Sequence, residues 1–110
     1  MPEVFIAEVK EVIHAFPWIE RVDSEAVGRV ARLRLWIDEN FVDIYHNTQT
    51  GSTSYAYIVQ GDRLFGANNM RIGWHIHSFG NPEVHRKSKP ISIKEFLSEL
   101  ERELKNRGEI

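Results

Sequence analysis

The segment from Val27 to Ile37 restricts the fold more than any other part of this sequence, because apolar and polar residues alternate along it. Successive side chains of a strand point to opposite faces, so the alternation predicts a strand with one buried face. The polar residues Asp38–Asn40 predict a tight turn, and Phe41–Asn47 then returns as a partner strand. Sequential strands joined by short turns usually form an antiparallel sheet.

Further strands are expected in the second half of the chain. The segments Ser54–Gln60 and Arg63–Ala67 each read as a strand, and Gly61–Asp62 predicts a two-residue turn between them. The stretch Gly73–Ser78 is the expected fifth strand, although glycine is uncommon inside strands. We interpret Phe79–Pro90, which holds two prolines and several basic residues, as an extended, exposed loop.

Amphipathic segments at the two ends predict helices. Apolar residues recur at the helical interval over 2–16, and Pro17 should end that helix. Ser92 and Glu95 form a capping box that predicts the start of a second helix, and Gly108 suits its C-terminal end. Both helices can cover one apolar sheet face. The predicted fold is therefore α+β: a single domain (1–110) with an antiparallel meander of four or five strands and N- and C-terminal helices packed on one face.

The opposite face of the sheet is expected to carry arginines and aromatic residues. Aromatic side chains on such a face can stack on nucleic-acid bases, but packing across strands is their more common role. The residues assigned to this face are Arg32, Arg34, Trp36, Asp43, Tyr45, Tyr55 and Tyr57.

Cysteine is absent from the sequence, which excludes a disulfide framework, a thiolate nucleophile and a zinc site with cysteine ligands. Glu3, Glu8 and Lys10 interrupt the apolar pattern of the N-terminus, unlike a signal peptide. No apolar run approaches the roughly 20 residues that span a bilayer. We therefore expect a cytoplasmic protein that has no membrane contact and no cofactor.

Charge is distributed unevenly along the chain. The segment from Arg63 to Lys94 has six basic residues and one acidic residue, a local charge of +5, whereas the whole chain carries −2. Such a segment is compatible with an anion-binding or nucleic-acid-binding surface. A solvated loop is the simpler explanation, and charge alone does not decide between the two.

Two histidines lie one residue apart, and on a strand His75 and His77 share one face. They could act as acid and base, because metal-free RNA cleavage needs a base for the 2′-hydroxyl, an acid for the leaving oxygen and cations for the phosphate. With His85 they could instead hold a metal ion. They could also be partly exposed polar residues without a chemical role.

Four segments together resemble one known family: Ser54–Gln60, Gly61–Phe65, Asn68–Asn69 and Trp74–His77. They are similar to the TumE-like family, which comprises the toxin components of toxin–antitoxin modules. The resemblance covers roughly the second half of the chain. It implies a small intracellular protein with an antitoxin partner, and ribonuclease activity follows only by analogy with other small toxins.

The chain departs from the pattern of this family at two positions. Asn68 stands where the family tends to have aspartate, and Trp74 stands where it tends to have a further histidine. The matching positions are Asn69, His75 and His77. If the replaced aspartate or histidine is catalytic, the activity of this chain is altered or lost.

The leading interpretation is a toxin that acts on RNA as a metal-independent ribonuclease, with His75 and His77 as its acid–base residues. One alternative is a non-catalytic module that binds a protein partner or a second copy of itself. The other is a metal-dependent hydrolase that uses His85 as well. The expected substrate contacts of the leading interpretation are Arg71, Arg86, Lys87 and Asn69.

Overall fold

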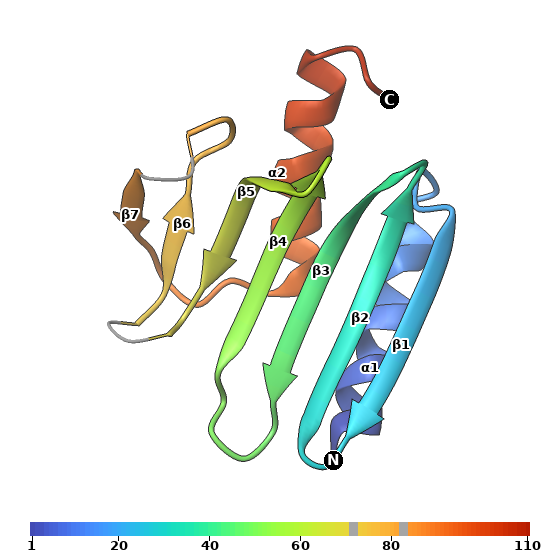
Figure 1. Ribbon diagram of the computed structural model, residues 1–110, viewed down its shortest axis with the longest axis vertical. Coiled ribbons are helices and arrows are strands. Elements are labelled where there is room, and N and C mark those ends of the chain that lie inside the picture. Colours follow the sequence, from blue (N-terminus) through green and yellow to red (C-terminus); the bar gives the residue numbers. More distant parts are fainter. Residues whose placement is uncertain (71–72, 82–83) are drawn as a thin grey trace.

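The computed structural model describes residues 1–70, 73–81 and 84–110 (Figure 1). An α-helix and a short 3-10 helix precede seven strands, and a second α-helix closes the chain. The elements are α1 (Pro2–Val12), the 3-10 helix η1 (Ile13–Ala15), β1 (Arg21–Val27), β2 (Val30–Ile37), β3 (Asn40–Asn47), β4 (Thr53–Val59), β5 (Asp62–Asn68), β6 (His75–His77), β7 (His85–Lys87) and α2 (Ile93–Asn106).

The strands form a single sheet in their sequence order, from β1 to β7, and all of the pairings are antiparallel. The predicted α+β class and the antiparallel meander are therefore confirmed. The predicted count of four or five strands is wrong, because the described chain contains seven.

The two unpredicted strands are the edges of the sheet. The side of β1 that faces the helices offers Val22, Ser24 and Ala26, so it lacks a clear apolar alternation. The strand β7 consists of three exposed residues within the segment that we expected to be a loop. Exposed edge strands are commonly charged, since charge discourages pairing with other chains, and such strands therefore lack the usual pattern.

At two tight hairpins the strand bounds differ from the predicted ones. Val27 ends β1 instead of beginning β2, and Gly28 at φ +59° opens the turn between these strands. The turn between β4 and β5 consists of Gln60 and Gly61, both at positive φ, so it precedes the expected turn by one residue. Positive φ at both central residues matches the right-handed twist of a hairpin.

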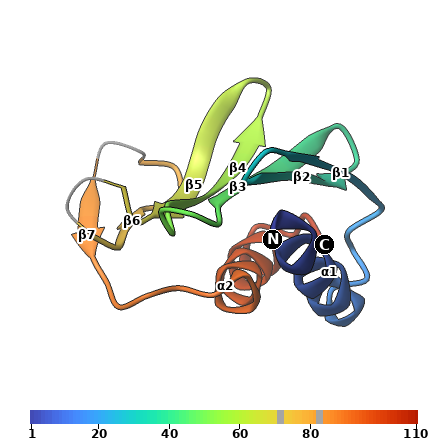
Figure 2. The same ribbon diagram turned by 90° about the horizontal axis from the view of Figure 1, so that it is seen from below.

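Both helices pack on the same face of the sheet (Figure 2). The cluster between the layers is built from alternate residues of the central strands and from the apolar sides of the helices, as predicted. Its most deeply buried members are Val9, Leu33, Leu35, Val42, Ile44, Tyr57, Phe96, Leu97, Leu100 and Leu104.

Tyr55 and Tyr57 belong to this core, so their assignment to the open face is wrong. They pair with Ile44 and Val42 and are only 4% and 1% exposed. The hydroxyl of Tyr55 donates to the carbonyl of Ile91 at 3.0 Å, and burial raises the pKa of Tyr55 to about 12. Both side chains point to the same face of the sheet as Ile44 and Val42. They therefore cannot form a base-stacking surface on the opposite face.

The second helix begins as its sequence predicts. The Oγ atom of Ser92 accepts from the backbone N–H of Glu95 at 3.1 Å, and the Glu95 carboxylate accepts from the N–H of Ser92 at 2.9 Å. These hydrogen bonds hold the pKa of Glu95 below its usual value. Gly108 at φ +72° follows the helix, as expected. In the described part of the chain, neither helix combines the length and apolar character needed to cross a membrane.

His46 gives the fold a testable pH dependence. Its ring stacks on Phe5 with centroids 4.2 Å apart, and its Nδ1 lies 2.8 Å from the Oγ1 of Thr53. Burial lowers its pKa below the ordinary value, so the unfolded chain binds this proton more readily than the folded chain. The stability linked to His46 is complete above about pH 6.5 and falls as acidification approaches the lowered pKa.

We therefore expect the free energy of unfolding to fall less steeply from pH 7 to pH 5 in His46→Gln than in the parent protein. Urea denaturation at several pH values measures this slope. The exposed His14 provides a control, and His14→Gln should retain the parent slope. Equal slopes in the parent and His46→Gln would contradict the assignment.

Candidate functional site

Three histidines converge on one face of the β6–β7 hairpin. His75 and His77 share a face of β6, and His85 of β7 lies opposite His77. The ring centroids are 5.0 Å apart for 75–77, 5.3 Å for 75–85 and 4.3 Å for 77–85. One nitrogen from each ring lies within 4.8 Å of the other two. Seven residues separate His77 from His85 in the sequence. The fold brings His85 next to the pair formed by His75 and His77.

This face is the one opposite to the helices. Ile76 pairs with Ala67 on the core side, which directs His75 and His77 to the other side. Nevertheless, His75 is only 7% exposed and His77 only 3%, whereas His85 is open to solvent. The two rings on β6 are therefore buried polar groups and are not the partly exposed residues of the simplest sequence interpretation.

The cluster lies at one end of the molecule. Figures 1 and 2 show β6 and β7 at one edge of the sheet, beyond the part that the helices cover. The edge strand β7 has no neighbour on its outer side in the described chain. A ligand can therefore approach His85 without displacing either helix.

The guanidinium of Arg63 lies beside one nitrogen of the His77 ring. Its Nη2 lies 3.2 Å from Nδ1 of His77. A guanidinium can only donate, so Nδ1 accepts and the proton of the neutral ring lies on Nε2. The Nε of Arg63 is buried and has no hydrogen-bond partner in the described structure. An unpaired buried donor costs about 1–3 kcal/mol, which makes Arg63 notable in a candidate site.

His75 has the opposite pattern. Its Nδ1 lies 3.0 Å from the carbonyl oxygen of Gly73, which can only accept. Nδ1 therefore carries the proton, and Nε2 keeps a lone pair. The two rings of β6 thus differ in chemistry, because His75 offers a lone pair on Nε2 whereas His77 offers an N–H there.

Asn68 borders the same cluster. Its Nδ2 is 3.4 Å from Nε2 of His77, and its Oδ1 accepts from the backbone N–H of Met70 at 3.0 Å. In this arrangement both facing nitrogens are donors, so the 3.4 Å contact is not a hydrogen bond. A carboxylate at this position, as the TumE-like pattern has, would accept from His77 instead.

The predicted substrate contacts are only partly brought together. Lys87 lies directly opposite His75 on the same face, whereas Arg86 pairs with Ile76 and belongs to the other face. Asn69 accepts from the N–H of Thr53 at 2.7 Å and donates to the carbonyl of Gly51 at 2.9 Å, so it ties two loops together. The predicted contact Arg71 lies outside the described residues.

Arg63 was not among the predicted site residues, because a β-bulge decides its direction. Ile58 pairs with Arg63 and Tyr57 pairs with Phe65, which leaves Leu64 as the extra residue. Without this shift, strict alternation would direct Arg63 to the face that the helices cover. With it, Arg63 shares the face of Gly66 and His77. The local basic charge was the sole signal that this arginine could matter.

The remaining arginines and aromatic residues of the open face contact one another across β1–β3. The Arg21 guanidinium lies 4.6 Å from the Trp36 ring, and that of Arg34 lies 4.4 Å from the Phe41 ring. Arg34 also forms an ion pair with Asp43 at 3.7 Å. These contacts support the expected role of these residues in packing across strands.

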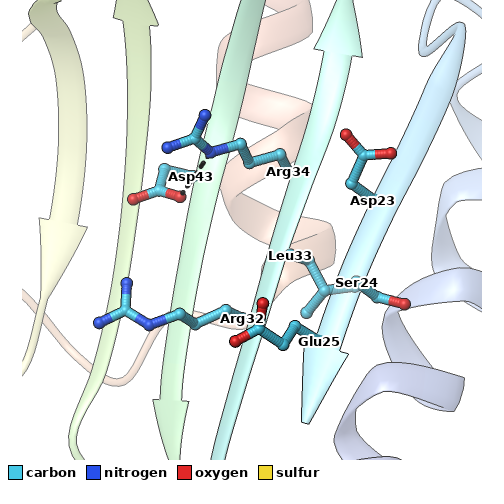
Figure 3. A pocket seen from close by; sticks show the side chains of 7 residues that line it. All are labelled: Asp23, Ser24, Glu25, Arg32, Leu33, Arg34 and Asp43. Carbon is cyan, nitrogen blue, oxygen red and sulfur yellow. Dashed lines mark ion pairs between the residues drawn. The ribbon is translucent and has the colours of Figure 1, made fainter. Parts of the chain in front are cut away.

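A shallow pocket of about 270 Å³ lies on this part of the sheet (Figure 3). Its charged lining residues are Asp23, Glu25, Arg32, Arg34 and Asp43. The lining mixes both signs of charge, and none of its residues belongs to the histidine cluster. We therefore place the candidate site at the histidines, where protons can be exchanged.

Comparison of the chain with protein-family models, with curated proteins and with solved structures gives no match. The function proposed below therefore rests on the geometry of the histidine cluster.

The space over Gly66 allows Arg63 to reach the cluster. A Cβ atom at this position would lie 3.1 Å from both the Cδ of Arg63 and the backbone oxygen of Tyr55. We expect Gly66→Ala to destabilise the fold by about 1–3 kcal/mol, as overpacking does. Chemical denaturation measures this cost.

A double-mutant cycle with Arg63→Ala isolates the contribution of the arginine. The cost of Gly66→Ala should be smaller in the Arg63→Ala background, because only the clash with the Tyr55 backbone remains. An unchanged cost in that background would show that the Arg63 side chain does not occupy the space over Gly66.

Proposed function

We propose that this chain is a metal-independent ribonuclease and the toxin of a toxin–antitoxin module. The observation that carries the catalytic proposal is the meeting of three imidazoles in different environments on one sheet face. Imidazole can exchange protons near neutral pH, and RNA carries its own nucleophile in the 2′-hydroxyl. The resemblance to the TumE-like family supports the toxin role and an antitoxin partner in the cytoplasm.

His75 is the proposed base. Its hydrogen bond to Gly73 leaves the Nε2 lone pair available to accept the proton of a 2′-hydroxyl. The O2′–phosphorus bond then forms while the phosphorus–O5′ bond breaks. The products are a 2′,3′-cyclic phosphate on one fragment and a 5′-hydroxyl on the other, so no water or cofactor is consumed in this step.

His85 is the proposed acid that protonates the leaving O5′. It is exposed to solvent, and its ring lies 5.3 Å from that of His75. The sequence interpretation gave the acid and base roles to His75 and His77 together, without dividing them. His77 is only 3% exposed and its Nδ1 accepts from Arg63, whereas the His85 ring is open to solvent, so we assign the acid to His85.

His77 and Lys87 are the proposed phosphate contacts. The Nε2–H of His77 can donate to a phosphate oxygen, and Arg63 keeps it in that form. Lys87 lies opposite His75 and adds positive charge on the same face. Donors that are fixed before the reaction stabilise charge that develops in the transition state.

We expect His75→Ala and His85→Ala each to slow RNA cleavage roughly 10²- to 10⁴-fold, the usual contribution of general acid–base catalysis. The assay uses a fluorescent RNA oligonucleotide panel with a chelator present. A DNA panel should remain intact because DNA lacks the 2′-hydroxyl.

His14→Ala is the matched control, since His14 is exposed on the opposite layer and should retain full activity. Circular dichroism confirms that each variant is folded. Intact RNA after incubation with the folded parent protein would refute the proposal. Equal cleavage by the parent and His75→Ala would refute the role of the histidine.

A further inference from the structure

The histidine cluster also has the features of a transition-metal site. The three candidate ligand nitrogens lie within 4.8 Å of one another, and tetrahedral Zn²⁺ with bonds of about 2.0–2.1 Å would place them roughly 3.4 Å apart. Only small side-chain movements are needed. His85 can supply part of that movement, because it lies on an exposed edge strand of three residues.

We propose that His75, His77 and His85 together bind one divalent transition-metal ion and leave a fourth position open to solvent. The contact of His75 with Gly73 supports this inference independently of ring proximity. Metal-binding histidines almost always donate their other ring N–H to a carbonyl or carboxylate, and the Nδ1–H of His75 does so at 3.0 Å.

The donor set indicates which ions fit. Three imidazoles suit Zn²⁺, Co²⁺, Ni²⁺ or Cu²⁺, whereas Mg²⁺ and Ca²⁺ prefer oxygen ligands. Such an ion would connect β6 to β7. It would therefore stabilise the edge strand, which is held along its inner side by three paired residues.

Arg63 opposes this binding. Coordination through Nε2 of His77 requires the ring proton to move to Nδ1, where the guanidinium now donates. The guanidinium must then turn away, and its charge also repels the ion. Arg63 therefore lowers the expected metal affinity, and a neutral side chain at position 63 should increase it.

Metal binding and the proposed cleavage exclude each other. A metal on Nε2 of His75 removes the lone pair that serves as the base, so the ion acts as an inhibitor. This consequence rests on the proposed function, whereas the binding itself does not.

The direct test is a Co²⁺ titration of the tag-free chain, followed by visible absorption. We expect one Co²⁺ per chain with the absorption of a four-coordinate site, and Zn²⁺ should displace it. His85→Ala should weaken binding at least about tenfold, and His14→Ala should leave it unchanged. Absence of saturable binding, or equal affinity in His85→Ala and the parent, would overturn the proposal.

Arg63→Gln separates the two proposals because it has opposite effects on them. The amide oxygen can accept from Nδ1–H of His77, so Co²⁺ should bind several-fold more tightly. Cleavage of RNA in the presence of a chelator should instead become slower, because Nε2–H of His77 is no longer fixed.

Weaker Co²⁺ binding in Arg63→Gln would contradict ligation by His77. Active cleavage without any metal binding would refute the metal site alone. Stoichiometric Co²⁺ binding without chelator-resistant cleavage would support the metal site and refute the proposed function.

Discussion

The hydrogen bond between Arg63 and His77 depends on the register shift between β4 and β5. The two helices occupy one face of the sheet and the histidine cluster lies on the other. Only side chains that point to this second face can reach the histidines. Leu64 is the extra residue of the bulge, and it turns the Arg63 side chain to this second face. Gly66 leaves space for the aliphatic part of the Arg63 side chain. The bulge therefore places the Arg63 guanidinium beside Nδ1 of His77.

Short-range patterns in the sequence predicted the central part of the fold. Alternation between Ala31 and Ile37 identified a central strand, the Ser92–Glu95 box identified the start of α2, and the His-x-His spacing placed two rings on one face. The failures concern long-range packing. The edge strands lack apolar alternation, and Tyr55 and Tyr57 were placed on the wrong face because aromatic residues suit either face. Neither the bulge nor the burial of His75 and His77 has a local signature.

The two proposals require different protonation states of the same ring nitrogens in the histidine cluster. The proposed metal-free catalysis needs an unprotonated Nε2 on His75 and a protonated Nε2 on His77. Metal binding through these atoms needs both nitrogens to be unprotonated. Arg63 favours the first state, since it can only donate to Nδ1 of His77.

The most direct measurement of the central claim is the chemical structure of the RNA ends, determined by mass spectrometry after cleavage with a chelator present. Cleavage by His75 and His85 produces a 2′,3′-cyclic phosphate and a 5′-hydroxyl, because the RNA supplies its own nucleophile. Fragments with a 3′-hydroxyl and a 5′-phosphate, formed only when a transition metal is added, would contradict the account and indicate hydrolysis by metal-activated water.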